Sequence, residues 1–314
     1  MSPLPPAIFL MGPTASGKTN AAVYLKQHLP VELISVDSAL VFQDMNIGTA
    51  KPDQATLTIA PHYLIDIIPP TSAYSAANFR EDALALMAEI TARGNVPVLV
   101  GGTMLYFKSL VSGLSGLPEA SQQIRAEIDA EAAQIGWPMM HAKLASIDPE
   151  TAARLQPNDM QRIQRALEVY AISGETMTQL YAKQSTQSFP YRVLKLALIP
   201  SDRSVLHARI ATRFQQMLND GLVDEVRALL EKYPTLTMES TSMRCVGYRQ
   251  VLEFMQGQYP LEELCDRGIF ATRQLAKRQL TWLRGMEDTV ELDCLDTQLN
   301  AQVMQQIENF NSLI

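Results

Sequence analysis

The residues best suited to chemistry stand near the start of the chain, where Gly12-Pro13-Thr14-Ala15-Ser16-Gly17-Lys18-Thr19 follows a short apolar run. This stretch matches the pattern G-x-x-x-x-G-K-[ST] at every fixed position. Ala7 to Met11 is suited to a buried strand, and Asn20 to Leu29 has helical spacing. A glycine-rich turn between a strand and a helix directs backbone N–H groups at one point, where the helix N-terminus adds positive charge. We therefore predict a phosphate-binding loop, not a glycine turn that only joins strand to helix.

Two side chains of this loop have predicted roles. Lys18 is expected to reach the terminal phosphates of a bound diphosphate or triphosphate. The hydroxyl of Thr19 is expected to ligate Mg²⁺. The loop pattern alone does not separate a diphosphate ligand from ATP.

Polar side chains also follow two further predicted strands. Asp37 comes directly after the apolar run Val31 to Val36, and the run that begins at Val96 ends in Gly101-Gly102-Thr103. Because parallel α/β sheets bind ligands outside the carboxyl ends of their strands, Asp37 and Thr103 are expected to face the cleft of the phosphate loop. A Walker B type Mg²⁺ ligand, a general base and a turn or N-cap aspartate remain open as roles for Asp37.

The order of the apolar runs predicts an α/β protein with a P-loop NTPase-like parallel sheet flanked by helices. Further strands are expected at Tyr63 to Ile68 and Val193 to Ile199, and helices at Ser75 to Arg93 and Ser204 to Leu218. The first of these helices has an apolar face formed by Phe79, Ala83, Leu86 and Ile90.

A block from residue 118 to residue 188 interrupts this pattern. It is rich in alanine, is punctuated by prolines and has no convincing strand. We therefore predict an inserted all-helical domain at 118–188 within a core domain formed by 1–117 and 189–314. The closing segment from Glu287 to Ile314 is acidic and polar, and no chemistry is expected there.

Arginines on predicted helices are candidates for binding phosphate groups. Arg162 and Arg165 stand off an apolar stripe, and they are either phosphate ligands or part of a solvated face. The stripe is expected to consist of Ile163, Ala166, Leu167 and Tyr170. Arg213 is our choice for an arginine that stabilises a leaving group.

The last strong helix is predicted to have a cationic face. At about 100° per residue, Arg273, Lys277 and Arg284 share one side. The opposite, packing side is expected to hold Leu275, Leu280, Trp282 and Leu283. Since no acidic residue lies four positions from these cations, an anionic partner explains the face better than internal salt bridges.

Composition limits the function classes. The 314 residues are 47% hydrophobic and 19% charged, and a net charge of −7 argues against indiscriminate coating of nucleic acid. Cys245, Cys265 and Cys294 lie far apart without C-x-x-C spacing, which favours reduced thiols over disulfides or zinc. No apolar run is long enough to cross a bilayer and no basic leader precedes the phosphate loop, so we expect a cytoplasmic protein.

Taken together, these motifs resemble those of the bacterial tRNA dimethylallyltransferases, also called tRNA isopentenylpyrophosphate transferases. The resemblance covers nearly the whole chain and follows the family's order of motifs. The matching motifs are Gly12 to Thr19, Asp37-Ser38, Asn46 to Pro52, Gly101 to Tyr106, Arg162-x-x-Arg165-Ala166-Leu167-Glu168-Val169, Val246 to Arg249 and Lys277 to Trp282.

This resemblance implies transfer of a dimethylallyl group from dimethylallyl diphosphate to N6 of the adenosine just 3′ of the anticodon in tRNA. It implies Mg²⁺ as cofactor, held by Thr19, and Asp37 as the residue that accepts the amine proton, with Thr103 and Lys18 also catalytic. The diphosphate would be bound by Gly12, Pro13, Thr14, Ala15, Ser16, Gly17, Lys18, Thr19 and Arg213.

The resemblance also implies residues that grip the anticodon stem-loop. They are Asp37, Ser38, Ala39, Leu40, Thr103, Arg125, Gln161, Arg162, Ile163, Gln164, Arg165, Arg244, Cys245, Val246, Gly247, Tyr248, Arg249, Arg273, Lys277, Arg278 and Arg284. We expect no membrane partner, and a monomer.

The chain departs from the family at two positions, and other functions stay open. Many members have Gln and Tyr where this chain has Leu40 and Phe42, so the contacts of those side chains to the flipped base are not carried over. The alternatives are a small-metabolite or nucleotide kinase, a non-catalytic RNA-binding P-loop protein, and a transferase that uses a free adenosine nucleotide. The long cationic helix argues against the kinase and the nucleotide acceptor, and the intact Asp37, Lys18, Thr19 and Thr103 argue against the non-catalytic protein.

Overall fold

In the computed structural model, the chain divides into two compact units, each with its own core. The structure describes residues 4–113, 117–183 and 188–311. Met1–Leu110 and Pro190–Ile314 form what we call the sheet unit, and Val111–Phe189 form the helical unit. The sequence-based division had its boundaries after residues 117 and 188.

The sheet unit is built on one parallel sheet. Among the described residues its six strands stand in the order β3-β2-β4-β1-β5-β6. β1 lies in the middle, with Leu10 opposite Val100 of β4 on one side and Leu196 of β5 on the other. The predicted α/β fold with a parallel sheet is therefore confirmed. The strands are β1 (Pro6–Met11), β2 (Val31–Val36), β3 (His62–Tyr63), β4 (Val96–Gly101), β5 (Arg192–Ile199) and β6 (Thr289–Asp293).

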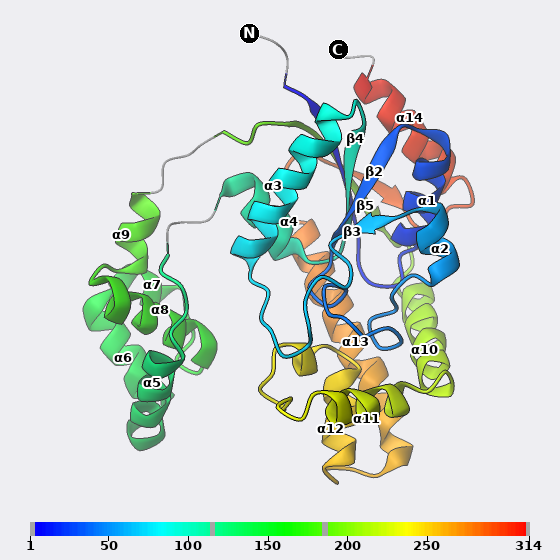
Figure 1. Ribbon diagram of the computed structural model, residues 1–314. Helices are drawn as coiled ribbons and strands as arrows, with labels where there is room; N and C mark the ends of the chain where they lie inside the picture. The colour runs from blue at the N-terminus through cyan, green and yellow to red at the C-terminus, as the bar shows by residue number, and fades with distance from the viewer. Residues whose placement is uncertain (1–3, 114–116, 184–187, 312–314) are drawn as a thin grey trace. The chain divides into compact units, whose positions relative to one another are not determined.

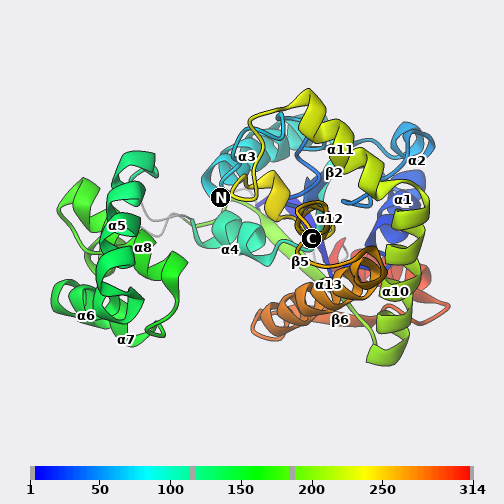
Figure 2. The ribbon, with the colours of Figure 1, turned by 90° about the horizontal axis from the view of Figure 1, so that it is seen from below.

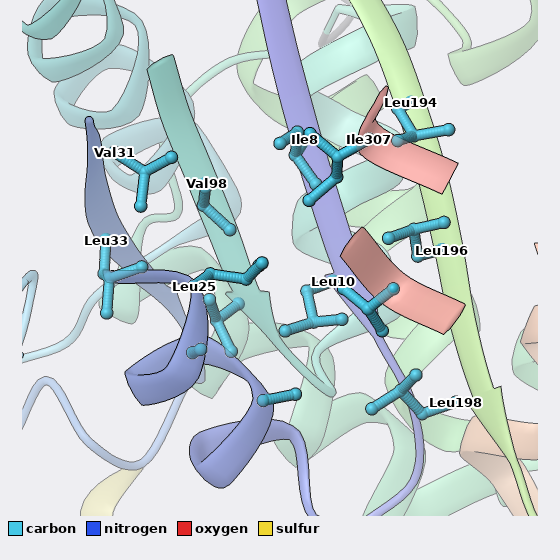
Figure 3. Close-up of a cluster of buried hydrophobic side chains, with 14 of the residues drawn as sticks. Ile8, Leu10, Leu25, Val31, Leu33, Val98, Leu194, Leu196, Leu198 and Ile307 are labelled. Atoms are coloured by element: carbon cyan, nitrogen blue, oxygen red, sulfur yellow. The ribbon is translucent and has the colours of Figure 1, made fainter. Parts of the chain in front are cut away.

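Helices cover both faces of this sheet (Figure 1). On one face, Leu25 of α1 and Ile307 of α14 pack against Leu10 and its neighbours in adjacent strands (Figure 3). On the other face Phe107 of α4 contacts Phe9, with ring centroids 5.0 Å apart. Burial of both faces explains why the strands are nearly continuous apolar runs. These helices are α1 (Lys18–His28), α2 (Gln54–Ile59), α3 (Ala76–Ala92), α4 (Met104–Ser112) and α14 (Leu299–Asn311).

A second layer of helices follows β5 and surrounds the carboxyl end of the sheet. Figure 2 looks onto this end, with α10 to α13 towards the viewer. Their core contains Phe42, Phe214 and Tyr248, all at most 3% exposed. The elements are α10 (Arg203–Asn219), α11 (Leu222–Lys232), the 3₁₀ turn Ser242–Arg244, α12 (Tyr248–Met255) and α13 (Leu261–Leu283).

The helical unit has its own small core, which includes Ile128, Met140, Leu144 and Ile163. Its described residues contain helices and no strand. Two of the prolines in this block begin helices, since Pro138 and Pro149 lie in the first turns of α6 and α7. The helices are α5 (Gln122–Ile135), α6 (Trp137–Ile147), α7 (Pro149–Ala153), α8 (Met160–Ser173) and α9 (Met177–Ala182).

Several sequence-based expectations are wrong in detail. The strand expected from Tyr63 to Ile68 ends at Tyr63, and Ile68 makes only an isolated bridge to Phe42. On α3 the buried face uses Met87 where Leu86 was expected, and Tyr170 on α8 is 39% exposed.

The segment from Glu287 onward, which seemed to be a polar end, instead supplies β6 and α14. Only Leu292 of β6 is buried, which explains why its pattern carried little strand signal. Val303 and Ile307 of α14 lie in the core of the sheet unit.

Candidate active site

The phosphate loop joins the end of β1 to the start of α1. Gly17 (φ +82°) and Ala15 (φ +63°) both have left-handed backbone, which lets the chain turn tightly. A Cβ on Gly12 would lie 2.9 Å from the carbonyl oxygen of Leu198 in β5, so the loop packs closely on the sheet. Among the described residues, the backbone N–H groups of residues 17–19 donate to no protein acceptor, as expected for the first turn of a helix. These groups are free to bind an anion.

Lys18 is folded back against this loop. Its Nζ donates a hydrogen bond to the carbonyl oxygen of Pro13 at 2.6 Å and lies 3.5 Å from Ser16 Oγ. Burial lowers the pKa of Lys18 to about 8, and the nearby carboxylate of Asp37 opposes that shift. A phosphate beside Lys18 would favour its charged form, so anion binding and protonation of Lys18 are coupled.

Two side chains from helices distant in sequence hold Thr14 of the loop. Arg213 of α10 donates from Nη2 to the Thr14 hydroxyl at 2.5 Å. Gln279 of α13 accepts the Thr14 N–H through Oε1 at 2.8 Å, and its Nε2 donates to the carbonyl oxygen of Gly102 at 2.9 Å. Arg213 was predicted at this site, whereas Gln279 was included only in the family motif Lys277 to Trp282 and had no predicted role at the loop. Its only signal was a neutral amide within a basic segment, because its partners are 265 and 177 residues away.

The ends of β2 and β4 meet beside the loop. The N–H of Ser38 donates to Thr103 Oγ1 at 3.1 Å, and the N–H of Thr103 donates to the carbonyl oxygen of Val36 at 3.1 Å. Gly101 is required here, because a Cβ would lie 2.0 Å from that same carbonyl oxygen. Thr103 is thereby fixed between the two strand ends.

Asp37 faces the cations of the site. Its charge acts on both Lys18 and Arg213, where it opposes the pKa lowering that burial causes. Its Oδ1 accepts the N–H of Ala39 at 2.8 Å, and among the described residues it has no other hydrogen bond. The carboxylate therefore keeps acceptor capacity for a ligand.

These groups line one cleft of about 1020 Å³ in the sheet unit. Its walls are the phosphate loop, the ends of β2 and β4, α10, α13 and the segments 48–52 and 241–246. Ala39 and Leu40 line it as well, whereas Phe42 is buried in the core. Other cleft residues, none of them individually predicted as a site residue, include Ser35, Tyr74, Arg209, Leu275, Gln279 and Trp282.

The face of α13 that meets the cleft is not the predicted cationic one. Leu275 and Trp282, expected to pack, line the cleft instead, and Trp282 is 42% exposed. The cationic face of Arg273, Lys277 and Arg284 points away from the cleft, since at about 100° per residue it lies opposite Leu275. Leu280 and Leu283 are buried as expected, in a stripe that also contains Leu264, Gly268, Thr272 and Ala276. Arg278, which was also predicted, does line the cleft.

The predicted segment from Arg244 to Arg249 divides between cleft and core. Arg244, Cys245 and Val246 line the cleft. Tyr248 is fully buried, and its hydroxyl donates to Glu225 Oε1 at 2.5 Å, so in this structure its side chain has no free surface for RNA. Gly247 (φ +95°) precedes it, and Arg249 pairs with Glu253 on the following turn.

Glu225 also holds the segment that begins at Asn46. Its carboxylate accepts backbone N–H groups from Asn46, Ile47 and Gly48 at 2.9, 2.8 and 3.2 Å. A Cβ on Gly48 would lie 2.5 Å from the Tyr248 ring, so only glycine fits at this point. This arrangement makes the segment a fixed wall of the cleft.

In the helical unit, two of the predicted residues, Arg125 and Arg165, contact a buried carboxylate. Glu168 is fully buried and accepts hydrogen bonds from Arg125 Nε at 2.9 Å and Arg165 Nη1 at 2.6 Å. Arg162 is largely exposed and pairs with Asp159, while Ile163 lies inside the core with no exposed surface. Gln161 is exposed and Gln164, partly exposed, donates to Asp129 at 2.6 Å.

The described part of the chain contains no helix both long enough and apolar enough to span a membrane. Its three cysteines are unpaired, and it holds no cluster of three or more His, Cys, Asp or Glu side chains that could bind a metal.

Comparison with known proteins gives a consistent family. Residues 40–286 match the family model described as IPP transferase. The tRNA dimethylallyltransferase of Methylobacillus flagellatus is 66% identical over 310 residues, covering 99% of this chain and 98% of that protein. The tRNA dimethylallyltransferase of Dechloromonas aromatica is 59% identical, with 98% of each chain covered.

Solved structures agree in sequence and in fold. The full-length tRNA isopentenylpyrophosphate transferase of Bacillus halodurans is 33% identical with a TM-score of 0.70, and 98% of each chain is covered. A eukaryotic dimethylallyltransferase crystallised acting on tRNA is 25% identical with a TM-score of 0.82, covering 98% of this chain and 80% of that one. The chain has a phosphate loop that faces the carboxylate of Asp37, and it matches these proteins over nearly its whole length. It therefore belongs to the tRNA dimethylallyltransferase family.

Proposed function

We propose that this chain transfers the dimethylallyl group of dimethylallyl diphosphate to N6 of the adenosine just 3′ of the anticodon in tRNA. The observation that carries the proposal is one cleft in which a phosphate loop with Lys18 and Arg213 faces the carboxylate of Asp37. The diphosphate leaves as an anion, so it needs cationic residues. The amine must lose a proton, so it needs a carboxylate beside them. Membership in the family supports the same reaction.

The cationic side of the cleft serves the leaving group. As the bond between the allylic carbon and the diphosphate oxygen breaks, negative charge grows on the diphosphate. Lys18, Arg213 and the free N–H groups of residues 17–19 are placed to stabilise that charge. Because the groups are already held by the fold, little reorganisation is needed during the reaction.

Asp37 serves the amine. An adenine amine is a weak nucleophile, so a carboxylate that accepts the N6 proton as the N6–carbon bond forms lowers the barrier. One oxygen of Asp37 is engaged by the N–H of Ala39, and the carboxylate has no other hydrogen bond among the described residues. Thr103, anchored beside it, would orient the reacting groups.

We infer that Mg²⁺ binds with the diphosphate. The protein atoms available near the loop are oxygens, which suit this ion. Thr19 would hold it, and Ser35 supports the fit, since its hydroxyl is buried, lines the cleft and has no partner among the described residues. When bound, Mg²⁺ would neutralise part of the charge on the diphosphate.

Binding of the tRNA requires that the reactive adenine leaves the base stack of the anticodon loop. The adenosine must be extruded from the anticodon loop to reach Asp37 within the cleft. Arg244 and Arg278 line the cleft and offer positive charge to the RNA backbone. We also propose that the protein acts as a monomer.

The test is incubation of the purified protein with Mg²⁺, labelled dimethylallyl diphosphate and unmodified tRNA, followed by nucleoside analysis. We expect prenylated adenosine, and none from a tRNA that lacks the adenosine 3′ of its anticodon. Folded protein that transfers no label but turns over ATP in the presence of small metabolites would replace this proposal with a kinase.

A further inference from the structure

One residue at the phosphate loop, Gln279, has no part in the proposed reaction. Its carboxamide joins α13 to two places at the carboxyl end of the sheet. Its Oε1 accepts a hydrogen bond from the N–H of Thr14, and its Nε2 donates one to the carbonyl oxygen of Gly102. Gly102 has no room for a side chain, since a Cβ would lie 2.3 Å from Gln279 Nε2. The amide is thus fixed in one orientation, with its oxygen towards the loop.

The consequence lies in which loop groups remain for phosphate. The N–H groups of residues 17–19 are free among the described residues, but the N–H of Thr14 is not. The Thr14 hydroxyl also accepts a hydrogen bond, from Arg213. One end of the loop is therefore open to an anion and the other is closed by protein groups.

Gln279 Oε1 also repels a phosphate oxygen. Both are hydrogen-bond acceptors, so a phosphate group at Thr14 would have to displace the carboxamide or leave its oxygen beside another acceptor. A ligand with two phosphates can use the open end and Lys18. A third phosphate would need further donors, and the N–H of Thr14 is already bonded to Gln279.

We propose that Gln279 is a specificity-determining residue that makes this loop select a diphosphate over a triphosphate. This inference rests on the proposed function and names the feature that separates the site from a nucleoside triphosphate site with the same sequence pattern. Gln279 acts here through Thr14, so it is a positioning residue for the loop.

The experiment is calorimetric titration of the full chain with Mg²⁺ and either inorganic pyrophosphate or inorganic tripolyphosphate. Wild-type protein is expected to bind pyrophosphate more tightly. Gln279→Ala removes the acceptor and should shift the affinity ratio towards tripolyphosphate by about tenfold, the size of one hydrogen bond. Gln279→Glu keeps an acceptor opposite the Thr14 N–H and adds negative charge, so the preference for pyrophosphate should persist or grow.

The matched control is Gln274→Ala on the same helix, at a position that does not line the cleft. Its affinity ratio should equal that of the wild type. Should Gln279→Ala fail to fold, as judged by thermal denaturation, the wild-type and Gln279→Glu ratios still test the idea. A wild-type protein that prefers tripolyphosphate, or a ratio that is unchanged in folded Gln279→Ala, overturns it.

Prenyl transfer is measured on the same wild-type preparation to keep the two proposals apart. Transfer without a diphosphate preference removes the role of Gln279 and leaves the proposed function standing. A diphosphate preference without transfer contradicts the proposed function. The selectivity of the loop would then stand, but it would serve another reaction.

Discussion

At the scale of single residues, the site depends on side chains whose charges oppose one another. Asp37 lies close enough to Lys18 and Arg213 to act on the pKa of both. All three were selected from the sequence, since Lys18 belongs to the loop motif, Asp37 follows a strand, and Arg213 lies on a helix that can lend an arginine to a leaving group. Gln279 lies in a family motif, but its role at the loop was not predicted, because that role depends on contacts with residues far away in the chain.

Asp37→Asn should strongly slow transfer without loss of RNA binding. The amide cannot accept the amine proton, so we expect the rate to fall by about 10² to 10⁴. Single-turnover rates give the first quantity and a binding titration with unmodified tRNA gives the second. Asp202→Asn, at the N-cap of α10 outside the cleft, is the control. An equal loss of RNA affinity in Asp37→Asn would mean that this residue serves recognition or structure.

The affinity for pyrophosphate should depend on pH through Lys18. Its lowered pKa of about 8 means that the ligand-free protein loses this positive charge as pH rises through that value. Pyrophosphate binding should therefore weaken above about pH 8 relative to a Lys18→Arg variant, whose charge persists. The quantity compared is the ratio of the pyrophosphate affinities of the wild type and Lys18→Arg. Protonation of pyrophosphate itself affects both affinities equally and cancels in this ratio. A ratio that stays constant from pH 7 to pH 10 would contradict the prediction.

At the scale of elements, local patterns predicted the central strands well and the helix faces less well. β1, β2, β4 and β5 are apolar runs buried on both faces, so their signal does not depend on orientation. On α13 the hydrophobic pattern has two apolar faces, because one packs in the core and the other, with Leu275 and Trp282, lines the cleft. Sequence alone gives no means to tell these two faces apart.

Arg278, which lines the cleft, can be compared directly with the cationic face on the opposite side of α13. If RNA enters the cleft, Arg278→Ala should weaken tRNA binding and lower the slope of log affinity against log salt by about 0.7 to 0.9 per lost phosphate contact. Replacing Arg273, Lys277 and Arg284 together tests the opposite face. The change in slope caused by Arg278→Ala should exceed one third of the change caused by the triple variant. If only the triple variant changes the slope, RNA is bound on the side of α13 away from the cleft.

Gly48→Ala should destabilise the wall that Glu225 holds. The added methyl would lie 2.5 Å from the Tyr248 ring, and relieving such overpacking costs about 1 to 3 kcal/mol. Urea unfolding measures the change. Gly285→Ala is the control, since its nearest neighbour would lie 3.6 Å away, and its effect should stay within about 0.5 kcal/mol. Equal stabilities of the two variants would contradict this account of the segment.

At the scale of the whole molecule, the chain consists of two units with separate cores. Only the sheet unit contains the cleft. In the helical unit, the conspicuous feature is the fully buried Glu168 with two arginines. Burial raises its pKa, but the hydrogen bonds from Arg125 and Arg165 outweigh burial, so the net pKa is lowered and the carboxylate stays charged.

Glu168→Gln should destabilise the helical unit alone. Removing the charge leaves two partly exposed arginines without their shared partner, and losing hydrogen bonds to a charged group costs about 1.5 to 3 kcal/mol. Calorimetry should show one unfolding transition that moves down and one that stays, because the two cores are separate. Glu131→Gln, in an exposed pair with Lys143, is the control and should cost less than about 1 kcal/mol. A single transition that shifts as a whole would show that the units unfold together.

The strand order of the sheet also sets when the site can form during synthesis. β1 is the first strand to leave the ribosome, yet its neighbours β4 and β5 follow much later, and β5 begins only at residue 192. At translation speeds of 5 to 20 residues per second, roughly ten to forty seconds separate β1 from β5. Gln279 arrives later still. The nascent chain must therefore keep its most apolar strand unpaired on one side while the helical unit is made, and we expect chaperone binding to be strongest in this interval.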